Sequence, residues 1–461
     1  MSKAAAAGPR SNQAQGESPA LALRAGRGYA RIGAEMAASK DPQGGSPLPA
    51  LRRDLDVFPI EHEGKPAFLI EDHEGISEHA LVVSPGGMAV ASLLDGRRTA
   101  AEIQSLIAKE TGSVLGPAEI EGLARQLEEA NLLETEAVRA GRRRVLEEFL
   151  ASPVRKKALK GAYPEAPLEL AAFLGGFFRA SKGPGRPPAE KPSLDVPPIG
   201  LISPHIDLER GGPAYAWAYG ALAESPPPDL IVALGVAHSS PNSPWAMTRK
   251  AYETPYGPMT VSAELYDELA GALWYDPLDD EWAHRREHSL EFQALWLKFL
   301  WRDKTPPWVP ILCSSFERFC PDKAPSSVPT VEDAIRKIGR TLARRGKTQR
   351  ILILAGVDLA HVGPRFADDM ELGPETEKKI EAEDRKSLEH AMALDADRFY
   401  LSVVEGGHWR KVCGLSALYT GLRWIKALNG EQPAKGELLT YGQAPDPLGG
   451  VVSFAAGVFR G

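Results

Sequence analysis

The 461-residue chain lacks the features of several broad protein classes. It has no run approaching the roughly 20 apolar residues of a membrane-spanning helix, so we expect no insertion into a membrane. Three cysteines are too few for a disulfide framework, which favours the reducing cytoplasm. The formal net charge is −7, so the composition gives no electrostatic support for binding nucleic acid.

Motifs of several common chemistries are absent as well. The chain contains no Gly-x-x-x-x-Gly-Lys-Ser/Thr, Gly-x-Gly-x-x-Gly, Gly-x-Ser-x-Gly, Cys-x-x-Cys or His-Glu-x-x-His pattern. The sequence signals for phosphate-binding loops, dinucleotide sites, serine nucleophiles, dithiol centres and zinc-peptidase helices are therefore missing.

What the chain does contain is an ordinary globular composition, with 43% hydrophobic and 25% charged residues. At about 150 residues per domain, its length predicts two or three domains. The low-complexity residues 1–48 predict a flexible tail, and the Pro- and Gly-rich residues 182–198 predict a linker or surface loop. We therefore expect a small domain over residues 49–140 and a larger one over residues 141–461.

The small domain combines strand-like and helical patterns. Apolar runs at residues 66–70 and 80–83 predict strands, and Ser84-Pro85 predicts the start of a helix. Thr99 and Glu102 form the capping-box signature of a further helix. This order of elements predicts a small winged-helix-like α+β fold. The glutamates of its last helix argue against a DNA-recognition helix, which contacts phosphates through Lys or Arg.

In the larger domain, apolar strand-like runs alternate with helical patterns from about residue 195 onward. The pattern predicts an α/β fold with a central sheet covered by helices on both faces. The expected strands cover residues 199–203, 230–235, 308–313, 351–355 and 451–458. The expected helices cover residues 163–178, 331–344, 375–393 and 414–428.

Three of the expected strands are followed by a histidine: His205, His238 and His361. Open α/β sheets bind ligands outside the carboxyl ends of their strands, so we expect these side chains to share one site. Imidazole there can bind a metal, move a proton or donate a hydrogen bond. The alternative for each one is a hydrogen-bonded histidine in a loop.

Acidic and neighbouring side chains extend this candidate site. Glu287 and His288, followed by Ser289, precede an apolar helical run and either line the pocket or cap the helix. Asp207 completes a His-x-Asp pattern with His205, which is half of a two-histidine, one-carboxylate iron triad. Otherwise Asp207 is a polar group of the pocket or a helix N-cap.

The cysteines have different contexts. Cys413 precedes the helix expected over residues 414–428, where the helix dipole favours a thiolate that is a nucleophile or a soft metal ligand. Cys313 and Cys320 lie in apolar surroundings, which indicates buried, inert thiols.

Together these motifs resemble the Memo family over about residues 150–461. The likeness is carried, in order along the chain, by Ala162–Pro164, Ser203–His205, Leu234–Ser239, Glu253–Gly257, Glu287–Ser289, Asp358–His361, Cys413–Gly414 and Val452–Gly457. Prokaryotic members are commonly called AmmeMemoRadiSam system protein B. The resemblance thus implies a radical SAM protein and an AMMECR-like protein as partners.

The resemblance also implies a fold similar to the class III extradiol dioxygenases, which are non-haem iron enzymes. It implies His205, His238 and Cys413 as metal ligands, with Asp358 and His361 in the same pocket and His361 as the acid–base group. The implied cofactor is Fe(II), and copper is the alternative because a His₂Cys set suits both metals.

Residues 50–138 resemble the PqqD-like winged-helix modules that bind leader peptides. Asp95–Thr99 and Glu129–Leu133 carry that likeness. It implies a peptide that adds a strand to the edge of the sheet. The alternative is a dimerisation or packing module.

The sequence therefore predicts a cytoplasmic, metal-dependent redox enzyme that acts with a radical SAM partner on a peptide or protein. A second hypothesis is a non-enzymatic peptide-binding scaffold with a vestigial metal site. A third is a cysteine-dependent hydrolase, with Cys413 as nucleophile and His361 or His205 as base.

Overall fold

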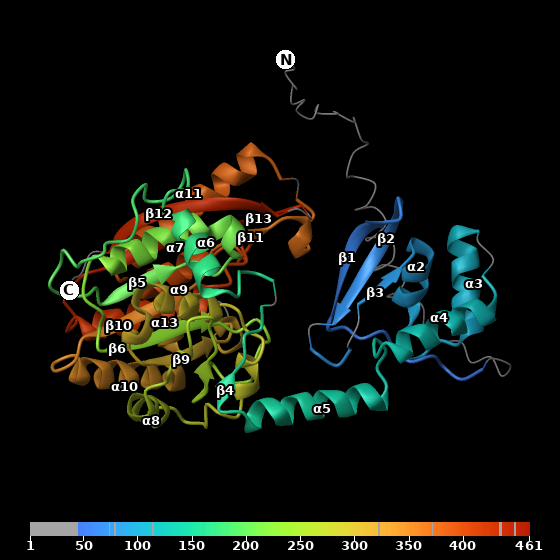
Figure 1. Ribbon diagram of the computed structural model, residues 1–461, viewed down its shortest axis with the longest axis horizontal. Helices are drawn as coiled ribbons and strands as arrows, with labels where there is room; N and C mark the ends of the chain where they lie inside the picture. The colour runs from blue at the N-terminus through green and yellow to red at the C-terminus, as the bar shows by residue number, and fades with distance from the viewer. Residues whose placement is uncertain are drawn as a thin grey trace, which may run out of the picture. The chain divides into compact units, whose positions relative to one another are not determined.

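The computed structural model describes residues 45–461, apart from residues 73, 78–79, 113–114, 160, 321–322, 371, 433–435 and 447–448. Most of the tail expected over residues 1–48 lies outside this part of the chain. The contacts divide the chain into two units, one ending at Glu148 and the other running from Phe149 to Gly461. Each unit is described by itself (Figure 1).

The first unit contains a three-stranded antiparallel sheet in the order β1-β2-β3. Its strands are β1 (Leu55–His62), β2 (Lys65–Asp72) and β3 (Leu81–Val83). The helices α2 (Pro85–Leu93), α3 (Ala100–Thr111), α4 (Pro117–Glu129) and α5 (Glu136–Ala151) follow, and the last three residues of α5 belong to the second unit. The strands expected over residues 66–70 and 80–83 are confirmed as β2 and β3. The sequence analysis did not include β1, which pairs with β2 over its whole length.

Local side-chain chemistry starts these helices where the sequence indicated. The Ser84 hydroxyl accepts a hydrogen bond from the Gly87 N–H, and Pro85 is the first residue of α2. The backbone N–H of Thr99 donates to Glu102 Oε2 at 2.8 Å, while the N–H of Glu102 donates to Thr99 Oγ1 at 3.3 Å. Both expected helix starts are therefore confirmed.

One buried cation joins the sheet of the first unit to its helices. The Arg52 side chain is fully buried and donates to Asp72 Oδ1 at 2.7 Å and to the Asn131 carbonyl at 2.9 Å. Burial alone would raise the pKa of Asp72, but Arg52 and the backbone N–H groups of Ser77 and Glu74 lower it from 3.8 to about 2. The carboxylate therefore stabilises the folded unit.

The second unit is built on a mixed sheet in the order β11-β13-β5-β10-β6-β9-β7, with β12 paired to β13. Its strands are β5 (Gly200–Ser203), β6 (Leu230–Val236), β7 (Trp245–Met247), β9 (Trp308–Cys313), β10 (Ile351–Gly356), β11 (His361–Val362), β12 (Glu437–Asp446) and β13 (Gly450–Phe459). The four central strands β5, β10, β6 and β9 are parallel. A separate pair joins β4 (Val154–Arg155) to β8 (Ala251–Tyr252).

Helices cover both faces of this sheet because successive residues of each strand face opposite sides. On β6, Val232 and Leu234 pack into one hydrophobic cluster, whereas Ile231 and Ala233 pack into another. The first cluster includes residues of α8 (Ala263–Ala270), α10 (Pro329–Arg345), α11 (Pro374–Met392), α12 (Ala396–Val404) and α13 (Leu415–Leu428). The second includes residues of α6 (Pro167–Phe177), α7 (Leu208–Ala223) and α9 (Glu291–Trp301). The α/β architecture is therefore confirmed, and Figure 1 shows the layers.

The helix expected over residues 163–178 begins later than its apolar pattern indicated. It starts at Pro167, because the backbone before a proline is disfavoured in helical conformation. Tyr163 instead donates its hydroxyl to Glu291. Residues 182–198 contain no helix or strand, as the composition predicted.

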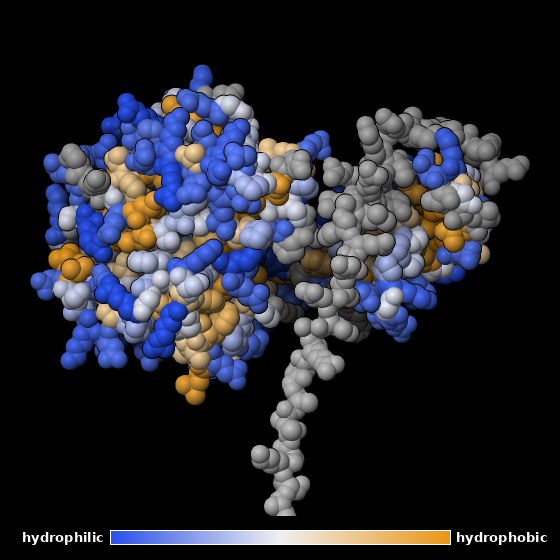
Figure 2. All heavy atoms as spheres, turned by 90° about the horizontal axis from the view of Figure 1, so that it is seen from above, coloured by the Kyte–Doolittle hydropathy of each residue, from blue (hydrophilic) through white to orange (hydrophobic). Residues whose placement is uncertain are grey.

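On the face of the second unit seen in Figure 2, apolar groups are scattered among hydrophilic residues. Among the described residues, no helix combines the length and apolar character needed to cross a membrane.

We predict that Asp72→Asn destabilises the first unit by about 2 kcal/mol at neutral pH, because one pKa unit corresponds to about 1.4 kcal/mol. The pKa of Asp72 is lowered on folding, so its contribution is present above about pH 4 and is lost as the pH falls toward 2. All nine tryptophans lie in the second unit, between Trp217 and Trp424. The thermal transition of the first unit, followed by circular dichroism, should shift to lower temperature. The transition of the second unit, followed by tryptophan fluorescence, should not change. An unshifted circular dichroism transition would show that Asp72 contributes nothing.

Candidate metal centre

The candidate site lies at the carboxyl ends of three neighbouring parallel strands. Strand β10 lies between β5 and β6. His205 follows the end of β5, His238 follows the end of β6, and Asp358 follows the end of β10. The strand order therefore brings together residues that are far apart in the sequence, at a place where open α/β sheets bind ligands.

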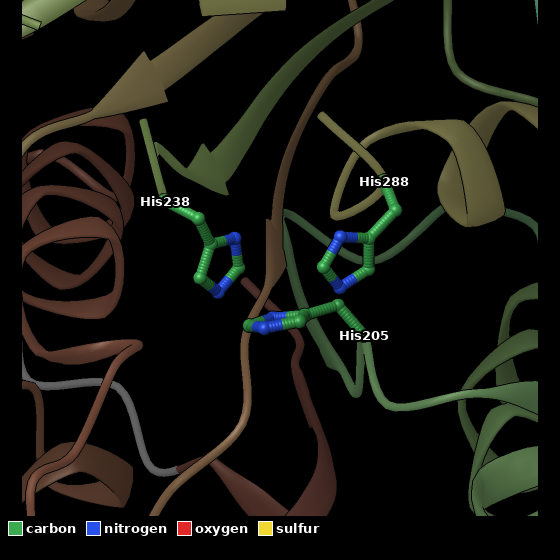
Figure 3. A group of neighbouring side chains, drawn as sticks. All are labelled: His205, His238 and His288. Carbon is green, nitrogen blue, oxygen red and sulfur yellow. The ribbon is translucent and has the colours of Figure 1, made fainter. Parts of the chain in front are cut away.

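Three imidazoles meet at this edge. One nitrogen from each of His205, His238 and His288 lies within 4.8 Å of the other two. The ring centroids are 5.2 Å apart for His205 and His238, 5.4 Å for His205 and His288, and 5.0 Å for His238 and His288. Figure 3 shows the three rings, which come from separate segments, gathered around one space.

The tautomer of His205 is determined by its surroundings. Its Nδ1 lies 3.1 Å from the Gly356 carbonyl oxygen, which can only accept a hydrogen bond. Nδ1 therefore carries the proton, and Nε2 keeps a free lone pair. Burial and the neighbouring histidines hold the pKa of His205 well below its ordinary value, so the ring is neutral.

A buried carboxylate orients the second imidazole. Glu287 accepts from the backbone N–H of His238 at 2.9 Å and from its Nδ1 at 3.0 Å. It also accepts from the N–H of Ser289 at 3.0 Å, and its Oε1 lies 3.4 Å from Nδ1 of His288. Burial would raise the pKa of Glu287, but His238 lowers it strongly. A carboxylate behind the imidazole Nδ1 is the usual support of a metal-binding histidine.

Ser289 fastens the same segment to β6. Its hydroxyl donates to the Val236 carbonyl at 3.0 Å and accepts from the Val236 N–H at 3.1 Å. The helix that follows, α9, has Leu290 as its N-cap and no side-chain cap. The capping alternative for the Glu-His-Ser cluster is therefore wrong, because its polar groups bind β6 and the residues after it.

Cys413 brings a thiol to the cluster. Its Sγ lies 3.5 Å from His205 Nε2 and 3.8 Å from the Asp358 carbonyl oxygen. The following residue is glycine for a steric reason: a Cβ on Gly414 would lie 2.5 Å from that same carbonyl oxygen. Burial raises the pKa of the Cys413 thiol well above its ordinary value. The lowered pKa expected from the helix dipole is therefore not found in the metal-free chain, because desolvation outweighs it.

Asp358 and His361 are two further site residues that the sequence analysis predicted. Asp358 Oδ1 accepts from the N–H of His205 at 3.0 Å, and burial raises the pKa of its carboxyl to about 7. Nδ1 of His361 lies 3.1 Å from the Leu359 carbonyl oxygen, so its Nε2 is the free nitrogen. Burial lowers the pKa of His361 to about 4. No hydrogen bond between Asp358 and His361 is found in the described part of the chain.

Asp207 has a local role. Its Oδ1 accepts from the N–H of Arg210 at 3.0 Å as the N-cap of α7, and its 41% exposed side chain pairs with Arg210. The N-cap alternative for this residue is confirmed. The group of three metal-ligating side chains found among the described residues does not include it.

One pair of donor atoms has the separation that a shared transition-metal ion requires. With metal–sulfur bonds of about 2.3 Å and metal–nitrogen bonds of about 2.05 Å, tetrahedral geometry separates sulfur from nitrogen by about 3.5 Å. The Cys413 Sγ to His205 Nε2 distance is 3.5 Å. His205 and His238, whose Nδ1 atoms are both engaged, offer Nε2 to the same space. His288 adds a third nitrogen that the sequence analysis placed in the pocket without a ligand role.

A second layer of contacts supports the Glu287 segment, and the sequence analysis missed its central residue. Arg155 is fully buried and pairs with Glu291. It also donates to the carbonyl oxygens of Glu287 at 2.6 Å and His284 at 2.9 Å. Tyr163 donates to Glu291 at 2.7 Å. Nothing in the sequence around Arg155 distinguishes it from a surface arginine. The one signal that could have indicated a buried cation was Glu291, a carboxylate at the start of an apolar helix.

Comparisons with known proteins point to one family. The sequence model of the Memo-like protein family matches residues 155–458. A MEMO1 family protein of Aquifex aeolicus is 27% identical over 394 residues, which covers 85% of this chain and 96% of that protein. One from Thermus thermophilus is 32% identical over 272 residues, covering 59% of this chain and 74% of that protein. The Aquifex alignment is longer than the second unit, so part of the first unit recurs in that relative.

We predict that Glu287→Gln weakens metal binding by about 10- to 100-fold, because the carboxylate that orients His238 becomes neutral. Titration of the metal-free chain with Co²⁺ measures the affinity. Glu253→Gln is the matched control, since Glu253 is exposed and, within the described residues, its carboxylate accepts a single backbone N–H, from Lys157 at 3.2 Å. Equal affinities for the two folded variants would contradict the role of Glu287.

Proposed function

This chain belongs to the Memo family, and from that membership we propose that it is a metal-dependent redox enzyme. His205 and His238 hold one metal ion, and Cys413 or His288 supplies the third donor. Fe(II) is the proposed metal, with copper as the alternative, because nitrogen and thiolate donors suit both. The bound ion would supply electron transfer and Lewis acidity to a substrate in its open positions.

The observation that carries this proposal is the convergence of prepared donor atoms. The Nδ1 atoms of His205 and His238 are engaged by a carbonyl and a carboxylate oxygen. The thiol of Cys413 lies at the separation from His205 that a shared ion requires. Histidines with unrelated structural roles in loops would not be expected to direct their second ring nitrogens toward the same space.

The residues around the ion have separate tasks. His361 is neutral at pH 7 with a free Nε2, so it accepts a proton from the substrate and returns it. Asp358, buried beside His205 and with a pKa raised to about 7, is about half protonated at neutral pH. Its carboxyl also accepts the His205 N–H, so it keeps the first ligand in place.

The wider reaction follows from the family resemblance. We propose that the protein acts in the cytoplasm with a radical SAM protein and an AMMECR-like protein on a peptide or protein substrate. The first unit, a three-stranded sheet with helices, is proposed as a PqqD-like winged-helix module that binds the peptide by strand addition. The second unit is proposed to share the class III extradiol dioxygenase fold.

Elemental analysis tests the proposal. Protein purified anaerobically, without an affinity column that carries metal, should contain about one iron or copper per chain. His205→Ala and His238→Ala should each lose the metal while remaining folded. Of Cys413→Ala and His288→Ala, the one that abolishes binding identifies the third ligand. His390→Ala, near the end of α11, is the control and should keep the metal.

Failure to hold metal even after anaerobic reconstitution would refute the metalloenzyme. In that case, peptide binding by the metal-free chain would favour the scaffold hypothesis. Inactivation by alkylation of Cys413 and indifference to chelators would favour the hydrolase.

A further inference from the structure

Asp384 and Arg410 form a buried ion pair beside the segments that carry Cys413 and His361. Arg410 is 2% exposed at its side chain and Asp384 is fully buried. Arg410 Nη2 also donates to Ser387 Oγ at 2.8 Å and to the Ser402 carbonyl at 3.1 Å. The guanidinium thus anchors the loop after α12 to helices α11 and α12.

That loop needs an anchor because its backbone is strained. His408 and Lys411, on either side of Arg410, have φ values of 52° and 47°, a region that residues other than glycine rarely adopt. Two site residues depend on this geometry. The Arg410 carbonyl accepts the N–H of His361 at 2.7 Å, and Cys413 follows three residues later.

Asp384, the acidic member of the pair, holds the segment that follows β10. Asp384 Oδ2 accepts from the Ser453 hydroxyl at 2.5 Å and from the Tyr441 hydroxyl at 3.0 Å. Ser453 Oγ in turn accepts the N–H of Ala360 at 2.8 Å, and the Ser453 carbonyl accepts the N–H of Leu359 at 2.7 Å. Burial raises the pKa of the Asp384 carboxyl, and Arg410 opposes that shift.

We propose that Asp384, Arg410 and Ser453 are positioning residues that hold Cys413 and His361 in register with the histidine cluster. The inference rests on the proposed metal centre and assigns a role to Ser453 and to two residues outside the family motifs quoted above. A buried ion pair adds little net stability compared with apolar packing of the same volume. What this pair supplies is geometry, since the Asp384 carboxylate reaches the loop before Cys413 through Arg410 and the residues before His361 through Ser453.

The test uses Co²⁺, whose bond to a thiolate gives a near-ultraviolet charge-transfer band. Metal-free wild type, Asp384→Asn and Ser453→Ala are titrated with Co²⁺. Both variants should bind Co²⁺ about 10- to 100-fold more weakly. Where Cys413→Ala has identified the thiol as the third ligand, both variants should also lose most of the thiolate band. Leu342→Ala, a buried change on α10, is the control for destabilisation alone and should keep the band. Asp229→Asn, which breaks an exposed ion pair with Arg350, is the control for charge.

The inference would be overturned if folded Asp384→Asn and Ser453→Ala bound Co²⁺ with wild-type affinity and showed the wild-type thiolate band. Alkylation of Cys413 in the metal-free chain, followed by mass spectrometry, is independent of the proposed function. Both variants should react several-fold faster than wild type, because the segment that holds the thiol is released. If wild type binds no Co²⁺, the proposed function fails, and the alkylation rates alone then decide the positioning role: unchanged rates overturn it.

Discussion

The candidate site depends on the burial of one carboxylate, Glu287. A buried anion needs hydrogen-bond donors and a positive partner, and in the described part of the chain the partners of the Glu287 carboxylate belong to the site. Two come from His238, one from Ser289, and His288 lies next to its Oε1. The Ser289 hydroxyl is also hydrogen-bonded to the backbone of Val236, the last residue of β6. Movement of the carboxylate would therefore displace the strand that precedes His238. Strand, loop and ligand are therefore positioned by one set of contacts.

Much of this arrangement could be predicted from the sequence, and the reason is the regularity of parallel strands. A continuous apolar run that ends in a histidine reveals both the strand and the edge at which its side chain lies, which placed His205 and His238. Capping signals worked equally well at Ser84 and Thr99, because they depend only on neighbours within three residues. Interactions between distant residues were beyond such reasoning. Arg155 meets Glu291 across 136 positions, and the high pKa of the Cys413 thiol results from burial that only the packed fold creates.

Three buried arginines organise different parts of the molecule in the same way. Arg52, Arg155 and Arg410 each pair with a buried carboxylate and also donate to backbone carbonyl groups. The rigid fork of a guanidinium suits this task, since it offers five donors in fixed directions and remains charged when buried. Lysine in any of these positions would satisfy fewer of the carbonyl groups. Each arginine thereby joins an irregular segment to its neighbours by both an ion pair and backbone hydrogen bonds.

The order of the strands has a consequence for how the protein matures. β5 and β6 are separated by β10, so their ends are spaced correctly only after residues 351–356 have been synthesised and inserted between them. Cys413 meets His205 across 208 positions of the chain. During translation, the histidines therefore leave the ribosome long before the thiol does. In the proposed centre with Cys413 as a ligand, the donor set is complete only after almost the entire polypeptide has been synthesised.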